Sequence, residues 1–313
     1  MAKANKRSNR PSSSGLLLFI AAFVGALLLF AAGGVIWWKT THPSLPVFKP
    51  QDPTATQTTA PEKKARYDAN DRFSFAVYIT DDEGALQSLS LVLFEPDRDR
   101  IDVAALPKDL ALSTEDTQNT VAYTFQKNGA EGTQLALNRY LSNTIDYYVQ
   151  FSYSQVWRYF DTLGENLLVS LPKDVDETAA DGSFSLHLTA GEHALSAKQV
   201  ANFLRCTGWQ GGRRERADMH AFIVQAYLHQ FLADDRDLQA EHERLSAMCT
   251  TNFSEKRFRT LSSVLDWFAA VNRDEQSRLI NADGVFDGAG TTLHFIPNAP
   301  MITAIQDALK PHE

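Results

Sequence analysis

Hydrophobic and polar residues follow two different periods along most of the chain. Arg100–Leu106 has an apolar residue at every second position, which is typical of a β-strand. Asn128–Leu141 has apolar residues at helical spacing, which predicts an α-helix. The predicted strands are Phe73–Thr80, Leu86–Phe94, Arg100–Leu106, Asp146–Phe151, Leu167–Leu171 and Phe184–Leu188, with two weaker strands inside Val285–Ile296. The predicted helices are Asn128–Leu141, Ser152–Leu163, Ser196–Leu204, Arg213–Leu232, Leu238–Met248, Ser254–Val271 and Ala299–Leu309. Because strands and helices interleave, we expect an α/β fold with a mixed central sheet flanked by helices.

One segment is apolar on every face. Gly15 to Trp38 contains no charged residue, and at about 1.5 Å per residue it would span roughly 36 Å, more than a hydrocarbon core of about 30 Å. Four basic residues and no acid precede it, namely Lys3, Lys6, Arg7 and Arg10. This charge pattern predicts a cytoplasmic tail at 1–14, a single transmembrane anchor at 15–38 and an extracytoplasmic remainder, placing the protein in the cell membrane. A cleaved signal peptide is the alternative, but its apolar core usually has about 7–15 residues.

The next segment, residues 39–66, is rich in Pro and Thr and predicts an extended stalk that cannot bury a core. Residues 67–313 are enough for one sizeable α/β domain.

The whole chain has 30 Lys and Arg against 38 Asp and Glu, a net charge of −8. This excess of acids argues against a generally basic nucleic-acid binder, so we expect no nucleic-acid partner.

The sequence lacks several well-known catalytic motifs, including GxxxxGK[ST], GxGxxG, GxSxG and HExxH. Its two cysteines cannot build a disulfide-dense scaffold or a zinc site of three or four thiolates. On the expected topology, Cys206 and Cys249 lie outside the membrane, where they would form one disulfide or stay as two separate buried thiols.

Two short segments carry candidate chemistry. Lys108 and Asp109 directly follow the predicted strand that ends at Leu106, and strand ends often hold ligand groups in α/β folds. Residues 205–216 contain four arginines and one Glu, and Arg213 and Arg216 are three apart on one helix face. Guanidinium groups bind phosphate oxygens, and the first turn of a helix adds N–H donors, so this segment suits a pyrophosphate. The plainer alternatives are a solvated turn and an exposed basic helix start.

Several segments, in the same order, resemble the LytR-CpsA-Psr family. The most specific are EPDRDRIDVAALPKD, IDYYVQF with its following helix, and LTAGEHAL ahead of the arginines, within a match from about Phe73 to Leu232. The resemblance implies transfer of glycopolymers from a polyprenyl pyrophosphate carrier to peptidoglycan outside the membrane. It also implies Mg²⁺, arginines around the pyrophosphate and an apolar groove for the prenyl tail. The implied partners are therefore the membrane, a polyprenyl-pyrophosphate-linked glycan and peptidoglycan.

The family's charged residues carry over only in part. Asp109 keeps the acid expected near the metal and among the catalytic residues, and Lys108 replaces the family's arginine in a phosphate-binding position. Arg205 matches the first arginine of a pair whose second member falls on Thr207. Arg213 and Arg216 match the GRxxRQ motif, so the resemblance implies catalytic roles for Arg205 and Arg213 and phosphate binding by all three arginines.

Other family residues are absent. The R-S-D-T motif, which supplies an arginine and a metal-binding Asp, falls on residues 85–88, Ala-Leu-Gln-Ser, and a family lysine falls on Gln118. Removing such charges should reduce transfer sharply, because they stabilise charge on the phosphate oxygens. Three hypotheses stay open: a divergent working transferase, a non-catalytic binder of a polyprenyl-linked phosphate or cell-wall polymer, and an envelope interaction protein on the same fold.

The helix after Arg213 has an apolar face, made of Met219, Phe222, Ile223, Ala226 and Tyr227. These residues would line the prenyl groove or fill the core, and the core is the favoured interpretation.

Overall fold

The computed structural model describes residues 67–113, 119–232, 236–270 and 277–309. The predicted cytoplasmic tail, anchor and stalk, and Gln118, lie outside these residues. Within the described ranges, no helix is both long and apolar enough to cross a membrane.

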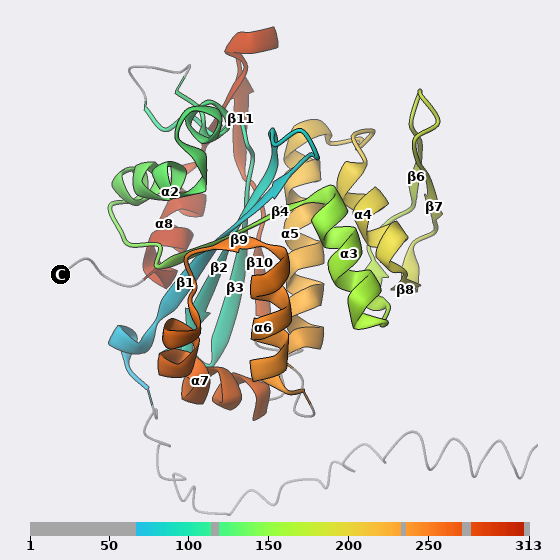
Figure 1. Cartoon of the computed structure of the whole chain (residues 1–313). Coiled ribbons are helices and arrows are strands. Elements are labelled where there is room, and N and C mark those ends of the chain that lie inside the picture. The colour runs from blue at the N-terminus through green and yellow to red at the C-terminus, as the bar shows by residue number, and fades with distance from the viewer. Residues whose placement is uncertain (1–66, 114–118, 233–235, 271–276, 310–313) are drawn as a thin grey trace, which may run out of the picture. The chain divides into compact units, whose positions relative to one another are not determined.

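Six strands form one mixed sheet in the order β10-β3-β2-β1-β4-β9 (Figure 1). Their bounds are β1 Phe73–Thr80, β2 Leu86–Glu95, β3 Arg100–Leu106, β4 Tyr147–Ser152, β9 Thr250–Thr251 and β10 Ser277–Ile280. β1, β2 and β3 pair antiparallel in succession, whereas β4 runs parallel to β1 and β10 runs parallel to β3. As a result β1, β3, β4 and β10 all point the same way, and their carboxyl ends share one edge of the sheet.

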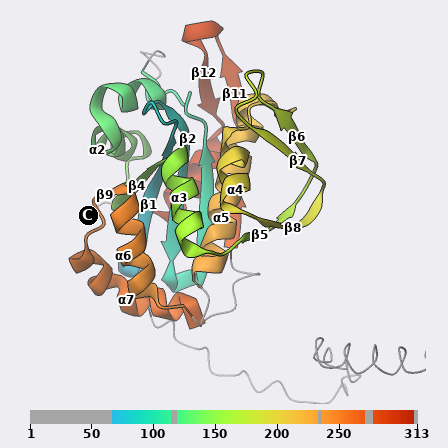
Figure 2. The same ribbon diagram turned by 45° about the vertical axis from the view of Figure 1, so that its right-hand side comes forward.

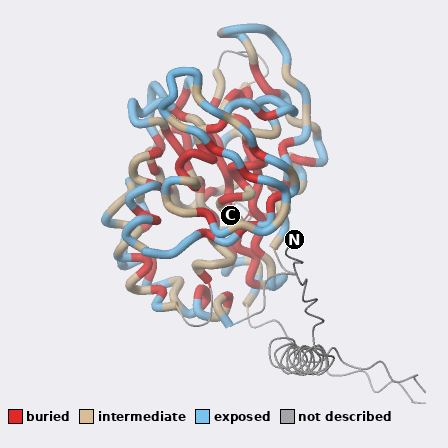
Figure 3. Tube along the Cα trace, turned by 90° about the vertical axis from the view of Figure 1, so that its right-hand side faces the viewer, coloured by how far each residue is buried: buried red, intermediate tan, exposed pale blue. Residues whose placement is uncertain are grey.

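Helices cover both faces of this sheet (Figures 1 and 2). One face carries α2 (Val121–Leu141) and α8 (Ala299–Ala308), and the other carries α3 (Tyr153–Leu163), α4 (Ala197–Arg205), α5 (Gly212–Phe231), α6 (Leu238–Met248) and α7 (Glu255–Ala270). The side chains of β1 alternate between the two cores: Ala76 and Tyr78 join the first, and Ile79 joins the second. The buried residues concentrate along the sheet between these layers, as Figure 3 shows. The expected α/β fold with a mixed sheet is confirmed.

Smaller elements surround the main sheet. Three two-stranded ribbons pair β5 (Leu167–Leu171) with β8 (Gly191–Leu195), β6 (Val175–Thr178) with β7 (Ser185–Leu188), and β11 (Gly284–Asp287) with β12 (His294–Pro297). Short 3₁₀ helices span Ala69–Asp71, Pro96–Arg98 and Gly290–Thr292. The β6–β7 and β11–β12 hairpins extend away from the helical layers (Figure 2).

The start of α3 follows from a cap that the sequence shows. Ser152 caps α3 by accepting a hydrogen bond from the Gln155 N–H at 3.3 Å, and the Gln155 side chain accepts one from the Ser152 N–H at 2.7 Å. The start predicted for α2 is wrong: the helix begins at Val121 instead of Asn128, after the N-cap Thr120. Gly129, with φ of 64°, has a non-helical conformation inside α2. This break lies directly beside Asn128, where the helix was predicted to begin.

Arg72 fixes the beginning of β1 at the edge opposite the carboxyl ends. Its guanidinium donates to both carboxylate oxygens of Asp97 at 2.8 and 2.7 Å, and to the backbone carbonyl of Asp307 at 2.7 Å. The neighbouring Glu95 is fully buried and pairs with Arg98 and Arg100 at 2.8 and 2.7 Å. This network ties the first strand to the β2–β3 hairpin and to the end of α8.

Both cysteines are free thiols in the structure, Cys206 buried and Cys249 partly buried. Of the two sequence alternatives, the structure therefore has separate buried thiols and no disulfide.

Candidate functional site

The carboxyl edge of the sheet gathers polar side chains from three strand ends. Asp81 and Asp82 follow β1, Lys108 and Asp109 follow β3, and Tyr153 follows β4. The first turns of α5 reach the same edge, because Arg213 Nη1 donates to Asp109 Oδ1 at 2.8 Å. This is the edge at which parallel strands commonly present ligand-binding groups.

A cavity of about 280 Å³, which we call the cationic pocket, lies where these elements meet. Four predicted site residues line it: Lys108, Asp109, Arg213 and Arg216. The other lining residues are Gln87, Ser88, Leu106, Pro107, Thr207 and Ala217. The structure thus brings together groups that are more than 100 positions apart in the sequence.

Two cations of this pocket contact only neutral groups. Arg216 donates to the Tyr153 hydroxyl at 3.0 Å and to Gln87 Oε1 and the Leu204 carbonyl, each at 3.4 Å. Lys108 Nζ donates to the same Gln87 oxygen at 3.3 Å. Across the part of the chain that the structure describes, neither Lys108 nor Arg216 forms an ion pair within 4.0 Å, whereas Arg213 is paired with Asp109.

The electrostatics of the pocket favour an anionic ligand. Burial lowers the pKa of Lys108, and the nearby charge of Arg216 lowers it further. Burial also lowers the pKa of His220 well below its usual value, and the charge of Arg216 lowers it further. His220 is therefore neutral at neutral pH and adds no positive charge to the pocket. An anion placed between Lys108 and Arg216 would relieve their mutual repulsion.

Two backbone amides at the start of α5 are already hydrogen-bonded within the protein, including the Gly212 N–H, which donates to the Trp209 carbonyl at 2.9 Å. The Gly211 N–H donates to the side chain of Glu215 at 2.6 Å, and Glu215 is itself paired with Lys173. The arginine side chains, and not this backbone amide, therefore face the pocket.

Arg205 is the one predicted site residue that does not line the cationic pocket. Its Nη2 pairs with Asp82 Oδ2 at 3.2 Å, and its guanidinium lies 5.4 Å from the centre of the Tyr153 ring. Tyr153 therefore stands between Arg205 and Arg216. Burial raises the pKa of this tyrosine to about 12, which keeps its hydroxyl neutral.

Sequence reasoning missed four residues of this site: Asp81, Asp82, Gln87 and Tyr153. Gln87 links Asp81 to the two cations, because its amide N–H donates to Asp81 at 2.7 Å while its oxygen accepts from Lys108 and Arg216. A usable signal existed: Asp81 and Asp82 directly follow the predicted strand Phe73–Thr80, and Tyr153 lies two residues after Phe151, as Lys108 lies two residues after Leu106.

Asp109 is the residue best suited to a metal. Among the described residues, no group of three or more His, Cys, Asp or Glu side chains could hold an ion. Asp109 Oδ2, however, is buried and has no hydrogen-bond partner. Mg²⁺ at phosphate sites commonly uses one or two carboxylates and completes its shell with phosphate oxygens and water. The donor set therefore fits Mg²⁺ when a bound phosphate supplies further ligands.

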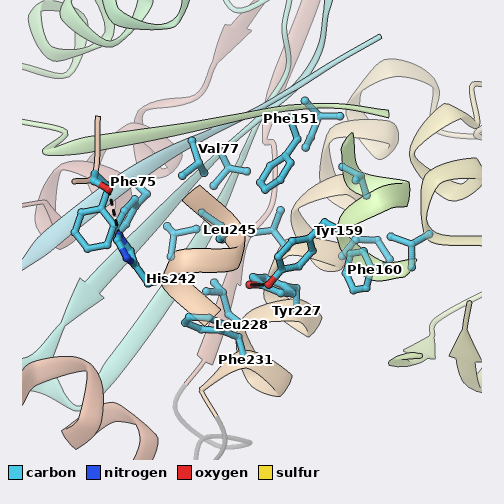
Figure 4. A pocket seen from close by; sticks show the side chains of 18 of the residues that line it. Phe75, Val77, Phe151, Tyr159, Phe160, Tyr227, Leu228, Phe231, His242 and Leu245 are labelled. Atoms are coloured by element: carbon cyan, nitrogen blue, oxygen red, sulfur yellow. Dashed lines mark hydrogen bonds between the residues drawn. The ribbon is translucent and has the colours of Figure 1, made fainter. Parts of the chain in front are cut away.

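A second cavity, of about 160 Å³, is lined almost entirely by apolar groups between the sheet and helices α3 to α7. We call it the apolar cavity. Figure 4 shows Val77 and Phe151 of the sheet facing Tyr227 and Leu245 of the helices. Of the predicted apolar face of α5, Ile223 and Tyr227 line this cavity, while Met219 is buried in the core.

The apolar cavity and the cationic pocket share no lining residue, but Leu204 and α5 connect them. Leu204 lines the cavity, and its carbonyl accepts a hydrogen bond from Arg216. Along α5, Ile223 lies two helical turns beyond Arg216, a distance of about 10 Å. A ligand with an anionic head and an apolar tail therefore has a complementary surface for each part.

A third depression, of about 840 Å³, opens on the other side of the cationic pocket. We call it the polar hollow. It shares Lys108, Asp109 and Arg213 with the pocket. Its remaining walls are Glu83, Gly84, Ala85, Leu86, Thr120, Ala122, Tyr123, Phe125, Gln126, Gly129, Gln150, Gly290 and Leu293.

Solved structures with the same fold include three that align over most of their length. A transcription regulator from Eubacterium siraeum aligns with a TM-score of 0.65 and 15% identity, covering 85% of this chain and 98% of that one. TagV of B. subtilis aligns with a TM-score of 0.61 and 19% identity, covering 76% and 95%. TagT bound to LIIa-WTA aligns with a TM-score of 0.57 and 14% identity, covering 77% and 91%.

A comparison with curated protein sequences gave no significant match. The model of the LytR_cpsA_psr family matches residues 51–310, which is most of the chain. These residues include the strands, the helices and every side chain of the cationic pocket. The chain therefore belongs to the LytR_cpsA_psr family, as its sequence motifs indicated.

Proposed function

We propose that this protein transfers a glycopolymer from a polyprenyl pyrophosphate carrier to peptidoglycan, from an anchored position on the outer side of the cell membrane. Family membership supports this role, as does the likeness in fold to TagT, which was solved bound to LIIa-WTA and LI-WTA. The observation that carries the proposal is the pair of cations, Lys108 and Arg216, that face one pocket without an acid partner beside an apolar cavity.

The carrier's pyrophosphate would occupy the cationic pocket. Arg216 and Lys108 already line it, and Arg213 would keep its Nη1 bond to Asp109 and offer its other N–H groups to a phosphate oxygen. Guanidinium groups suit this task because their paired N–H donors match two phosphate oxygens. The prenyl tail would continue past Leu204 into the apolar cavity.

The reaction joins an acceptor hydroxyl to the phosphorus that bears the polymer. A new P–O bond forms to the acceptor oxygen, the P–O bond of the anhydride breaks, and polyprenyl phosphate leaves with the bonding electrons. The hydroxyl proton passes to solvent water, late in a loose transition state. Lys108, Arg213 and Arg216 would stabilise the charge that develops on the phosphate oxygens.

Asp109 would hold Mg²⁺ through its unpartnered Oδ2. When bound, the ion would neutralise phosphate charge and act as a Lewis acid. Arg213, through its bond to Oδ1, fixes the orientation of the carboxylate that would receive the ion.

A non-catalytic binder is the second candidate function. Gln87 favours it, because a neutral amide sits between Lys108 and Arg216 where the family motif would place an acid. Such a protein would bind the carrier in the same pocket but turn it over slowly or not at all.

One experiment separates these functions. The full-length chain in phospholipid nanodiscs is incubated with a polyprenyl-pyrophosphate-linked oligosaccharide and peptidoglycan, with Mg²⁺ or with a chelator. A transferase releases polyprenyl phosphate and labels peptidoglycan when Mg²⁺ is present, whereas a binder retains intact carrier. Failure to bind the carrier at all would refute both functions.

Protease treatment of intact cells tests the location: the domain should be digested from outside, and in untreated cells the protein should be found in the membrane fraction.

A further inference from the structure

We propose that the polar hollow binds the acceptor as an extended polysaccharide, through a subsite centred on Tyr123. This inference rests on the proposed function and adds to it the place and the chemical class of the second substrate. The position of the hollow supports it first: Lys108, Asp109 and Arg213 belong to both the hollow and the cationic pocket. The hollow and the apolar cavity share no lining residue, so a carrier whose tail fills the cavity leaves the hollow free.

The volume of the hollow suits a short stretch of polymer. At about 840 Å³ it is three times the size of the cationic pocket, at about 280 Å³. Ligand sites in proteins commonly measure about 300–1,000 Å³. An oligosaccharide of a few rings therefore fits, with one hydroxyl at the shared boundary where the pyrophosphate would lie.

The walls of the hollow suit a neutral, hydroxyl-rich ligand. Glu83 is the one acid outside the shared boundary, and the only cations of the lining, Lys108 and Arg213, lie at that boundary. Gln126 and Gln150 supply side-chain amides, which both donate and accept hydrogen bonds. Outside the boundary no lining residue is a cation, and Lys127, which contacts the Tyr123 ring, does not itself line the hollow.

Tyr123 offers a flat apolar surface with a polar edge. The residue is 50% exposed on the first turn of α2, and Lys127 Nζ lies 5.7 Å from the centre of its ring. A sugar ring has an apolar face of C–H groups that packs on an aromatic ring, while its hydroxyls bond to neighbouring amides. Lys127 lies over one face of the ring, so a sugar would pack against the opposite face.

Three glycines expose backbone in the same hollow. Gly84, Gly129 and Gly290 have φ values of 91°, 64° and 58°, a conformation that side chains other than glycine rarely adopt. No atom would lie within 4 Å of a Cβ at any of the three, so the space beside each is open. The space beside these three backbone positions is therefore free for a ligand that enters the hollow.

The test compares two ligands on the full-length protein in nanodiscs. Chitohexaose, a soluble chain of N-acetylglucosamine, probes the hollow, and farnesyl pyrophosphate probes the cationic pocket. We expect Tyr123→Ala to weaken chitohexaose binding about tenfold, equivalent to about 1.4 kcal/mol, with farnesyl pyrophosphate binding unchanged. Tyr123→Phe should retain chitohexaose binding because it keeps the ring. Trp157→Ala, which removes a 44% exposed aromatic from α3 outside the hollow, is the matched control and should change neither affinity.

The outcomes separate this inference from the proposed function. If farnesyl pyrophosphate binds the wild-type protein but chitohexaose does not, the acceptor subsite is wrong and the proposed function stands. If farnesyl pyrophosphate does not bind, the proposed function itself fails. Equal chitohexaose affinity for wild type and Tyr123→Ala, with circular dichroism showing both folded, overturns the subsite. Competition by a free stem peptide without sugar would also overturn it.

Discussion

Replacing Arg216 with methionine should separate ligand binding from folding stability. Arg216 donates to the Tyr153 hydroxyl, to Gln87 and to the Leu204 carbonyl, and all three acceptors are neutral. Because the donor is charged, the 3.0 Å bond to Tyr153 would contribute about 1.5–3 kcal/mol, and the two bonds of 3.4 Å less, so their loss would destabilise the fold. The substitution also removes two unfavourable features. One is the repulsion between Arg216 and Lys108, and the other is the buried Arg216 Nε, which has no hydrogen-bond partner. Both changes stabilise the fold and partly offset the lost hydrogen bonds. We therefore expect the free energy of unfolding to change by no more than about 2 kcal/mol.

The same substitution should weaken pyrophosphate binding far more. Hydrogen bonds to a charged group contribute about 1.5–3 kcal/mol each, and a bidentate contact has two of them. Losing that contact should therefore raise the Kd for farnesyl pyrophosphate about 100-fold or more. The Arg216→Met protein should also have a higher Lys108 pKa, because the charge of Arg216 lowers it in the native protein.

Isothermal titration calorimetry on the full-length protein measures the affinity, and urea unfolding measures the stability. Arg214→Met is the matched control, because Arg214 is the exposed neighbour on the same helix and lies outside all three cavities. A Kd for Arg216→Met within threefold of wild type would refute our account of the pocket. An equal loss of affinity in Arg214→Met would show that overall surface charge, and not the contact made by Arg216, determines pyrophosphate binding.

Three further predictions concern other parts of the molecule. Leu245→Trp narrows the apolar cavity and should weaken farnesyl pyrophosphate binding while leaving inorganic pyrophosphate binding unchanged in calorimetry; equal weakening of both would contradict a tail site there. Burial raises the pKa of Asp218 to about 6, so between about pH 4 and pH 6 the unfolded chain loses a proton that the folded protein keeps, and stability falls as the pH rises. Asp218→Asn keeps the oxygen that accepts from the Ala282 N–H and should be more stable than wild type at pH 8 but not at pH 4; an equal difference at both pH values would refute this. Burial raises the pKa of Cys206 and Cys249 to about 12, so native labelling at pH 8 should be slow and identical with and without reductant; an increase on reduction would reveal a disulfide.

The sequence could predict those elements that have a strong local signal. β1, β3 and β5 have their predicted bounds, because each is an apolar run ended by a polar turn. The sequence could not predict β9 and β10. These strands at the sheet edges have two and four residues, which are too few to show an apolar pattern. Their positions depend on pairing with β4 and β3, which is tertiary information. β6 and β8 were missed for a similar reason, because their outward residues are polar or charged.

The candidate site shows the same division. Lys108, Asp109, Arg213 and Arg216 were predicted because local charge and family motifs mark them, and folding places them in one pocket. Gln87 was not predicted as a contact residue, because an uncharged side chain inside an apolar strand gives no signal of its own. Its role follows from position: it lies on β2 beside β3, within reach of both cations.

The attachment of Arg72 determines how a pull on the preceding chain would act on the domain. Arg72 is anchored to Asp97 and to the end of α8, immediately before β1 begins. β1 then runs eight residues, about 26 Å, before it reaches the edge with the cationic pocket. Tension applied before residue 67 would therefore load first the contacts of Tyr67 with Ser263 and Trp267, and then the Arg72 ion pairs. The strand would have to shear along its full length before the pocket deformed. A pull on the chain before β1 would therefore be resisted at the edge of the sheet opposite Arg216.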